Sequence, residues 1–209
     1  DSSRFRAFIG RPTGHRSGLY GNRGKGKRGM GVRGMDRIGN RVCDYSAGMS
    51  SPMPLKPAHL YQINVSDGGV PKLSVGQARI THHGLDGDRQ RNRVVHGGVH
   101  RAVCLFSFEV IEALRAEGHG IAPGSSGENL TVAGIDWSHL RPGVHLSVGE
   151  VRLEITSYTA PCMHNARWFK DGAFSRISQK TYPGWSRLYA RVLSEGVVRT
   201  GDMVTIEEG

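Results

Sequence analysis

The sequence predicts a mainly β fold, an antiparallel barrel-like domain that carries one or two helical insertions. Three observations support this prediction. Beyond residue 60, apolar and polar residues alternate in several short segments, glycine-containing turns separate these segments, and only one stretch has the periodicity of a long helix. Many short strands combined with a single long helix are typical of barrel-like β domains.

The first half of this domain contains three predicted strands. In residues 61–65 apolar side chains at odd positions alternate with polar ones at even positions, which is the period of a half-buried strand. Further strands are expected at about 76–82 and 99–106. Residues 102–106 are continuously apolar, so we expect burial on both faces. Cys104 belongs to this run, and we interpret it as a small buried residue rather than a reactive thiol.

One helix is predicted between Ser107 and Gly118. The Ser107 hydroxyl can cap its first turn, and Phe108, Ile111 and Leu114 recur at a spacing that keeps them on one helix face. Gly118 is placed to end the helix, because glycine readily adopts the left-handed conformation found after helix C-termini.

The second half of the domain returns to strands. Apolar and polar residues alternate over 144–148 and again over 151–156, and Gly149 and Glu150 separate the two runs. This pattern predicts a hairpin with one buried face. Two further strands are predicted at 188–193 and 203–206, with a turn around residues 195–196.

Positive charge is concentrated at the N-terminal end of the chain. The whole sequence carries a net charge of +10, and residues 1–48 alone carry eleven basic and three acidic residues, a net charge of +8. The remaining 161 residues therefore carry only +2. We divide the chain into a basic, glycine- and arginine-rich leader (1–58) and a globular domain (59–209).

The leader has no apolar periodicity and contains eleven of the thirty glycines before residue 49. Such a segment cannot bury enough surface to offset its ordering entropy, so we expect it to be disordered. It is either an RNA-binding or targeting tail or an unstructured extension ahead of Met49. We favour the extension, because few aromatic residues interleave the arginines to stack on bases. Cys43 lies in this leader.

Cysteine usage and hydropathy indicate the cellular compartment in which we expect the protein. The three cysteines are odd in number and widely spaced, which argues against a disulfide-stapled secreted scaffold and favours reduced thiols in the cytoplasm. Mean hydropathy is −0.38, and no run of eighteen apolar residues occurs. We therefore expect neither a membrane span nor an association with membrane.

The most polar stretch of the domain runs from Gly84 to Arg101. Its glycines let backbone N–H groups approach a ligand, and arginines such as Arg89 and Arg101 offer planar charged forks for phosphate or carboxylate. It is either an anion-binding loop or a glycine-rich loop with solvated charges. A histidine metal site has weaker support, because no pair has a zinc spacing with a cysteine partner. The histidines considered are His82, His83, His96 and His100.

Two further stretches carry polar groups next to strands. Glu128 and Asn129 follow a loop of small residues and precede a predicted strand, where they could orient a ligand or cap a turn. Cys162 follows Pro161 beyond the end of the hairpin, with His164 two residues further on. A thiolate held there could bind a soft metal or accept sulfur, although a cysteine more often only packs.

Together these stretches resemble the MOSC family, named for the C-terminal domain of molybdenum cofactor sulfurases. The resemblance rests on the Gly84–Gln90 segment, the His-Gly-Gly-Val-His-Arg-Ala block at 96–102, the Gly-Glu-Asn-Leu sequence at 127–130, and the Pro-Cys pair at 161–162. It extends from about residue 60 to residue 207 and points to the stand-alone bacterial members of the YiiM type. It implies a β-barrel MOSC domain.

The resemblance also implies roles for individual residues. Cys162 would be the catalytic residue, either as a ligand of molybdenum in the pterin cofactor or as a carrier of persulfide sulfur. His164 stands where relatives often have lysine, so a positive charge there would depend on pH. The remaining residues would line the pocket around the pterin phosphate and the metal: Asp88, Arg89, His96, Arg101, Glu128 and Asn129.

The resemblance further implies that the protein reduces N-hydroxylated small molecules, with electrons from a separate reductase. The alternative enzyme is a sulfurtransferase supplied by a cysteine desulfurase partner. We expect no bound pyridoxal phosphate, because that cofactor belongs to the desulfurase domain of full sulfurases. A hypothesis of another class is a non-catalytic nucleic-acid-binding module, and we expect nucleic acid to bind only through the basic leader.

Overall fold

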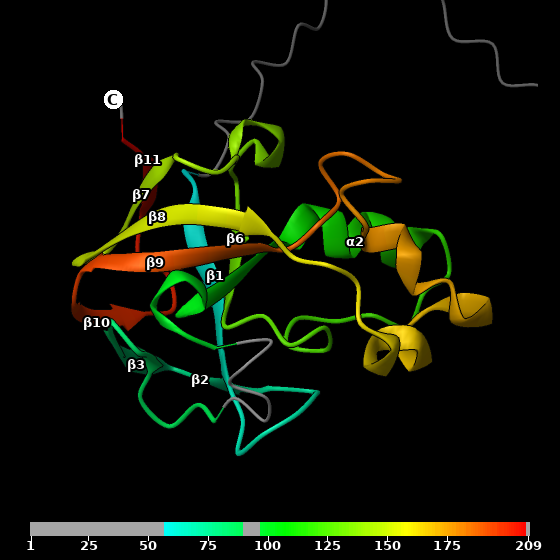
Figure 1. Cartoon of the computed structure of the whole chain (residues 1–209), viewed down its shortest axis with the longest axis horizontal. Helices are drawn as coiled ribbons and strands as arrows, with labels where there is room; N and C mark the ends of the chain where they lie inside the picture. Colours follow the sequence, from blue (N-terminus) through cyan, green and yellow to red (C-terminus); the bar gives the residue numbers. More distant parts are fainter. Residues whose placement is uncertain (1–56, 90–96, 208–209) are drawn as a thin grey trace, which may run out of the picture. The chain divides into compact units, whose positions relative to one another are not determined.

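Two β-sheets form the framework of the computed structural model, which describes residues 57–89 and 97–207. Most of the leader, Cys43 and His96 lie outside these residues. In the described part, eight strands form a sheet in the order β11-β7-β8-β9-β5-β6-β1-β2, and three form a sheet in the order β10-β3-β4 (Figure 1). The strands are β1 (His59–Val65), β2 (Leu73–Val75), β3 (Gln77–Thr81), β4 (Gly84–Leu85), β5 (Val103–Ser107), β6 (Leu130–Ala133), β7 (His145–Val148), β8 (Val151–Tyr158), β9 (Leu188–Ser194), β10 (Gly196–Arg199) and β11 (Val204–Ile206).

The large sheet closes on itself where the chain entering β11 meets β1. The Leu60 amide donates to the Asp202 carbonyl over 2.8 Å, and the Gly201 amide donates to the Leu60 carbonyl over 2.8 Å. His59 and Met203 form an antiparallel bridge between them. These bonds join the two ends of the series β11 to β1, so the mainly β, barrel-like fold predicted from the sequence is confirmed. The predicted antiparallel pairing is not complete, because β5 and β6 run parallel.

Alternating burial explains why these segments are strands. In β8 the side chains of Val151, Leu153 and Ile155 are fully buried, whereas their neighbours face outward. Val148 pairs with Val151 across the two-residue turn, which confirms the predicted hairpin. Every residue of β5 is buried, because β5 lies between β9 and β6 and is covered on both faces.

The one α-helix of the described residues, α2 (Phe108–Ala116), begins where the sequence predicts. The Ser107 hydroxyl accepts a hydrogen bond from the Val110 amide over 3.2 Å and caps the first turn. Ile111 and Leu114 are fully buried, and Gly118 follows the helix with a φ of 89°. The predicted amphipathic helix is therefore confirmed.

The predicted strand at 99–106 is wrong over its first residues. Val99–Arg101 form the 3-10 helix η1, and the strand β5 begins only at Val103. The His100 carbonyl accepts a hydrogen bond from the Thr156 hydroxyl over 2.5 Å, which holds η1 over the outer side of β8. This short helix carries His100 and Arg101, and both residues are exposed.

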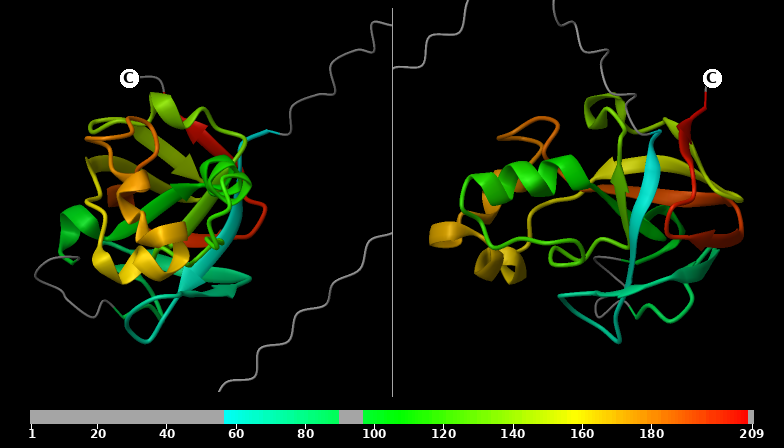
Figure 2. Two further views of the ribbon diagram at one scale, coloured as in Figure 1. Left: turned by 90° about the vertical axis from the view of Figure 1, so that its right-hand side faces the viewer. Right: turned by 180° about the vertical axis from the view of Figure 1, so that it is seen from behind.

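Short helical segments that were not predicted gather with α2 at one end of the barrel (Figures 1 and 2). Glu117, which follows α2, pairs with Arg176, and the His119 ring accepts a hydrogen bond from the Lys170 amide over 3.0 Å. These contacts fasten the segment after Cys162 to the helix. These 3-10 helices are η3 (Met163–Trp168), η4 (Lys170–Gly172) and η5 (Phe174–Ile177). A further 3-10 helix, η2 (Trp137–His139), lies away from them (Figure 1), and its Trp137 Nε1 donates to the Ser186 carbonyl over 2.9 Å.

Candidate functional site

Cys162 lies beyond the end of β8, directly before η3. The Thr159 amide donates to the Arg187 carbonyl over 2.9 Å, which holds the connecting segment against the start of β9. The Asn165 amide donates to the Cys162 carbonyl over 2.9 Å, so the cysteine begins a hydrogen-bonded turn. The Cys162 side chain is partly exposed at this turn.

The Cys162 thiol has a polar partner in His164. Their Sγ and Nδ1 atoms are 3.1 Å apart. A neutral imidazole can accept the thiol proton, and an imidazolium can donate a hydrogen bond to the resulting thiolate. His164 is exposed and can therefore exchange its proton with solvent. A proton acceptor therefore lies within reach of the thiol, and the thiolate is the form of cysteine that binds soft metals or attacks electrophiles.

Tyr189 lies among the charged and thiol groups of this region. The Arg101 guanidinium carbon is 5.7 Å from the centroid of its ring. Burial raises the pKa of the Tyr189 hydroxyl to about 12, Cys104 and Cys162 act in the same direction, and Arg187 and Arg101 oppose them. Tyr189 is therefore a neutral hydroxyl near two thiols and two guanidinium groups. The only sequence signal for it was its outward position in a strand whose neighbours are apolar.

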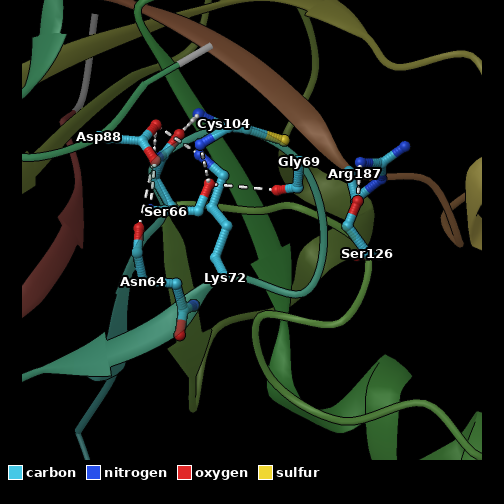
Figure 3. A network of polar contacts seen from close by, with 10 residues as sticks. Asn64, Ser66, Gly69, Lys72, Asp88, Cys104, Ser126 and Arg187 are labelled. Carbon is cyan, nitrogen blue, oxygen red and sulfur yellow. Dashed lines mark hydrogen bonds and ion pairs between the residues drawn. The ribbon is translucent and has the colours of Figure 1, made fainter. Parts of the chain in front are cut away.

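Asp88 is buried at the end of the polar loop that contains Gly84. Its Oδ2 pairs with Lys72 Nζ over 2.5 Å and accepts a hydrogen bond from Asn129 Nδ2 over 2.9 Å, and its Oδ1 accepts from the Ser66 amide over 2.9 Å (Figure 3). The Asp88 side chain is 4% exposed. The structure therefore brings the predicted residues Asp88 and Asn129 together, in a buried cluster with Lys72.

Asn129 joins three segments through one side chain. Its Oδ1 accepts from the Cys104 amide over 3.1 Å, while its Nδ2 donates to the Asn64 carbonyl over 3.3 Å as well as to Asp88. The backbone groups of Cys104 and Asn64 belong to buried residues, and the Asn129 side chain supplies hydrogen-bond partners to both. Asn129 therefore fixes the position of β6 relative to β5 and β1.

The Glu128 carboxylate faces its own loop. Its Oε1 accepts hydrogen bonds from the Gly124 amide over 2.5 Å and from the Thr131 hydroxyl over 3.3 Å, and its Oε2 accepts from the Ser126 hydroxyl over 2.7 Å. Glu128 is fully buried. These bonds hold residues 124–128 in one conformation against the strand β6.

The remaining predicted site residues have different surroundings. Arg89 is 76% exposed and pairs with Asp67 over 3.0 Å, so it lies at the surface beyond the buried Asp88. His96 lies outside the described residues. Among the residues that the structure describes, no group of three or more histidine, cysteine or acidic side chains could hold a metal ion, which leaves the histidine metal site without support.

Cys104 is a buried thiol, as predicted from its apolar run. It lies opposite Tyr189 in the pairing of β5 with β9, which places both side chains on the same face of the sheet. Burial raises the pKa of the Cys104 thiol to about 11, with Arg187 and Lys72 opposing the shift and Glu128 adding to it. Cys104 is therefore protonated at neutral pH, and Cys162 is the accessible thiol of the described chain.

More than half of the chain matches a known family model. The model of the MOSC domain matches residues 92–205, which span η1, the Asn129 region, Cys162 and the strands up to β11. The chain belongs to the MOSC domain family. This confirms the family inferred from the sequence motifs.

Two curated proteins are similar to this MOSC chain. The uncharacterised protein YflK of Bacillus subtilis is 30% identical over 118 residues, which are 56% of this chain and 52% of YflK. The protein YiiM of Escherichia coli is 30% identical over 136 residues, which are 62% of this chain and 59% of YiiM. The chain thus spans between half and two thirds of the length of each.

Solved structures of YiiM share the fold. YiiM from Geobacillus stearothermophilus has a TM-score of 0.55 at 21% identity, covering 73% of this chain and 76% of that structure. YiiM from Escherichia coli has a TM-score of 0.53 at 23% identity, covering 73% of this chain and 69% of that structure.

No helix in residues 57–89 or 97–207 is both long enough and apolar enough to span a membrane.

Proposed function

We propose that this MOSC protein binds the molybdenum cofactor through Cys162 and reduces N-hydroxylated small molecules with electrons from a separate protein. The observation that carries the proposal is the Cys162–His164 pair, a partly exposed thiol 3.1 Å from an imidazole nitrogen at the start of η3. A family whose name refers to the molybdenum cofactor supports the same assignment.

The residues present fit such a cofactor. A thiolate is a suitable ligand for a soft metal, and Cys162 has a base beside it that can take the thiol proton. Because the described residues contain no cluster of protein ligands, Cys162 would serve a metal whose other ligands come from the pterin. When bound, the cofactor would supply a centre that exchanges electrons and an oxygen atom with the substrate.

Each predicted residue has a role in this proposal. Cys162 would ligate the metal, and His164 would hold the thiol proton or release it to solvent. Arg101 would direct positive charge toward the pterin phosphate from beside Tyr189. The buried Asp88, Glu128 and Asn129 would shape the pocket from beneath, and Arg89 and His96 would contribute positive charge or hydrogen bonds to the cofactor.

The reduction has a defined balance. Breaking one N–O bond consumes two electrons and two protons and releases the amine and one water molecule. The electrons would come from a partner protein. His164 is the exposed titratable group beside the sulfur and would exchange protons with solvent during turnover.

Metal analysis tests the proposal. The protein is expressed in a host that makes the cofactor, and molybdenum and pterin are measured per chain by mass spectrometry. We expect near-stoichiometric metal in the wild type and in the control Cys43→Ser, and loss of most of it in Cys162→Ser. Equal metal content in the two serine variants would rule out ligation by Cys162.

The second candidate function is sulfur relay, which the partial exposure of the Cys162 thiol also favours. In this version Cys162 carries a persulfide received from a cysteine desulfurase. Thiol mapping after incubation with desulfurase and cysteine would place an added sulfur on Cys162. A wild-type protein that binds molybdenum and shows no sulfur adduct would exclude the relay.

A further inference from the structure

Within residues 57–89 and 97–207, three arginines present the same edge to a glutamate. Each presents its Nε and Nη2 atoms, which form one edge of the guanidinium, to a single carboxylate at distances between 2.5 and 2.9 Å. Arg152 and Arg176 bind the two oxygens of their carboxylates, whereas both Arg191 nitrogens bind the same oxygen. The two-oxygen arrangement matches the spacing of carboxylate or phosphate oxygens. The pairs are Arg152 with Glu207, Arg176 with Glu117, and Arg191 with Glu154.

Arg187 is more buried than these arginines and has no carboxylate partner in the described part of the chain. It is 6% exposed, and its Nη1 donates to the Ser126 carbonyl. Its Nε is buried and has no hydrogen-bonding partner. On the edge that the other three arginines present to glutamate, the buried Nε of Arg187 is therefore left without an acceptor, although an unpaired buried donor on a charged group is costly.

The Arg187 guanidinium belongs to the surroundings of Cys162. The Ser126 carbonyl that binds it also accepts a hydrogen bond from Asn165 Nδ2 over 3.5 Å, and the Asn165 amide in turn binds the Cys162 carbonyl. Arg187 is also the cation that most opposes the raised pKa of Cys104. In Figure 3 the Arg187 side chain lies apart from the Lys72–Asp88 cluster, with the Cys104 sulfur directed to the same side.

We propose that the Nε–Nη2 edge of Arg187 binds an oxyanion group, a carboxylate or a phosphate, of a small molecule held beside Cys162. Because the site lies near Cys162, its ligand would be the substrate or the cofactor of the function proposed above. The inference rests on that proposed function. The oxyanion belongs either to the substrate or to the pterin phosphate, since both present the same pair of oxygens to the guanidinium.

Calorimetric titration of the full chain with inorganic phosphate, and separately with acetate, at constant ionic strength tests the site without any turnover. We expect one saturable phosphate site in the wild type and a loss of affinity of about tenfold or more in Arg187→Lys, which keeps the charge and loses the planar fork. The matched control is Arg191→Lys in β9, the strand that follows Arg187. The Arg191 side chain is already paired with Glu154, so the affinity of this variant should equal that of the wild type.

Arg187→Met provides a second variant if the lysine variant is unstable. Removing an unpaired buried charge should leave its thermal unfolding midpoint in chloride equal to or above that of the wild type, and phosphate should no longer raise the midpoint. Absence of saturable phosphate binding in the wild type, or equal binding in Arg187→Lys, would overturn the proposal.

The molybdenum and pterin content of Arg187→Lys separates the two sources of the oxyanion. A fall in content together with weaker phosphate binding assigns the site to the pterin phosphate. Full content together with weaker phosphate binding assigns it to the substrate. Phosphate binding should persist in Cys162→Ser, so failure of the cofactor proposal is distinguishable from failure of the oxyanion site.

Discussion

At the residue scale, two ion pairs that use the neighbouring residues Asp88 and Arg89 differ in their exposure to solvent. Lys72 and Asp88 are 9% and 4% exposed, whereas Arg89 and Asp67 are 76% and 86% exposed. We expect Asp88→Asn to destabilise the fold by about 3–5 kcal/mol, because it leaves the Lys72 ammonium buried without its partner. The measurement is equilibrium unfolding in urea.

The matched control for Asp88→Asn is Asp67→Asn, the same chemical change in the exposed pair. Solvent screens that pair, so the expected cost is below about 1 kcal/mol. Similar urea midpoints for the two variants would show that the Lys72–Asp88 pair contributes no more than a surface pair.

The Cys104 thiol predicts how stability depends on alkaline pH. Its folded pKa is about 11 against an ordinary value of 9.0, so the stability that the protonated thiol provides is fully present below pH 9. That stability is lost as the pH rises through about 11, and the loss amounts to about 2–3 kcal/mol. Unfolding free energies of the wild type and Cys104→Ala, compared from pH 8 to pH 11.5, measure it. A difference between the two proteins that stays constant over this range would contradict the prediction.

At the scale of elements, the loop 124–128 depends on a glycine where the backbone leaves no room. A Cβ on Gly124 would lie 2.4 Å from the Lys72 carbonyl oxygen, and the residue has a φ of +83°. Gly87 has the same φ of +83° and open space around it. We expect Gly87→Ala to cost about 1–2 kcal/mol for the left-handed backbone alone. Gly124→Ala should cost about 3–5 kcal/mol, because overpacking adds to that strain.

Urea unfolding of both alanine variants measures these costs. In Gly124→Ala the displaced loop should also weaken the hydrogen bond between the Gly124 amide and Glu128. Equal destabilisation by the two substitutions would mean that the loop moves freely away from Lys72.

Local pattern was sufficient for the elements whose side chains alternate or repeat. The hairpin of β7 and β8 and the helix α2 follow from periodicity and from the Ser107 cap. The strands β2, β4 and β10 were not predicted, because they have only three, two and four residues, too few to show a period. The 3-10 helices after Cys162 depend on distant contacts, such as that of Arg176 with Glu117, which no local pattern contains.

The candidate site was predictable where chemistry follows the order of the chain. Cys162 and His164 are two residues apart, so their contact could be anticipated from spacing. Tyr189 and Arg187 could not be, because the pairing of β9 with β5 brings them to the thiols across a long stretch of sequence. Arg187 has no motif around it, and only its burial and its missing carboxylate single it out.

At the scale of the whole molecule, most of the net positive charge and the described strands lie in different parts of the chain. All described strands find their partners within residues 58–207, and the residues that close the barrel, His59 and Met203, stand near the two ends of that range. Residues 1–48 hold +8 of the net charge of +10. We therefore expect a chain that lacks residues 1–48 to unfold at the same urea concentration as the full chain.

Deletion of residues 1–48 should separate nucleic-acid binding from metal binding. If the basic leader binds RNA, the full chain should show an affinity for a single-stranded oligonucleotide that falls steeply with salt, because each neutralised phosphate releases counterions. The shortened chain, with a net charge of only +2, should lose most of this affinity and its salt dependence. Its molybdenum content should equal that of the full chain, since Cys162, His164 and their contacts lie outside the deleted segment. Salt-dependent binding that survives the deletion would instead locate a nucleic-acid site on the MOSC domain itself.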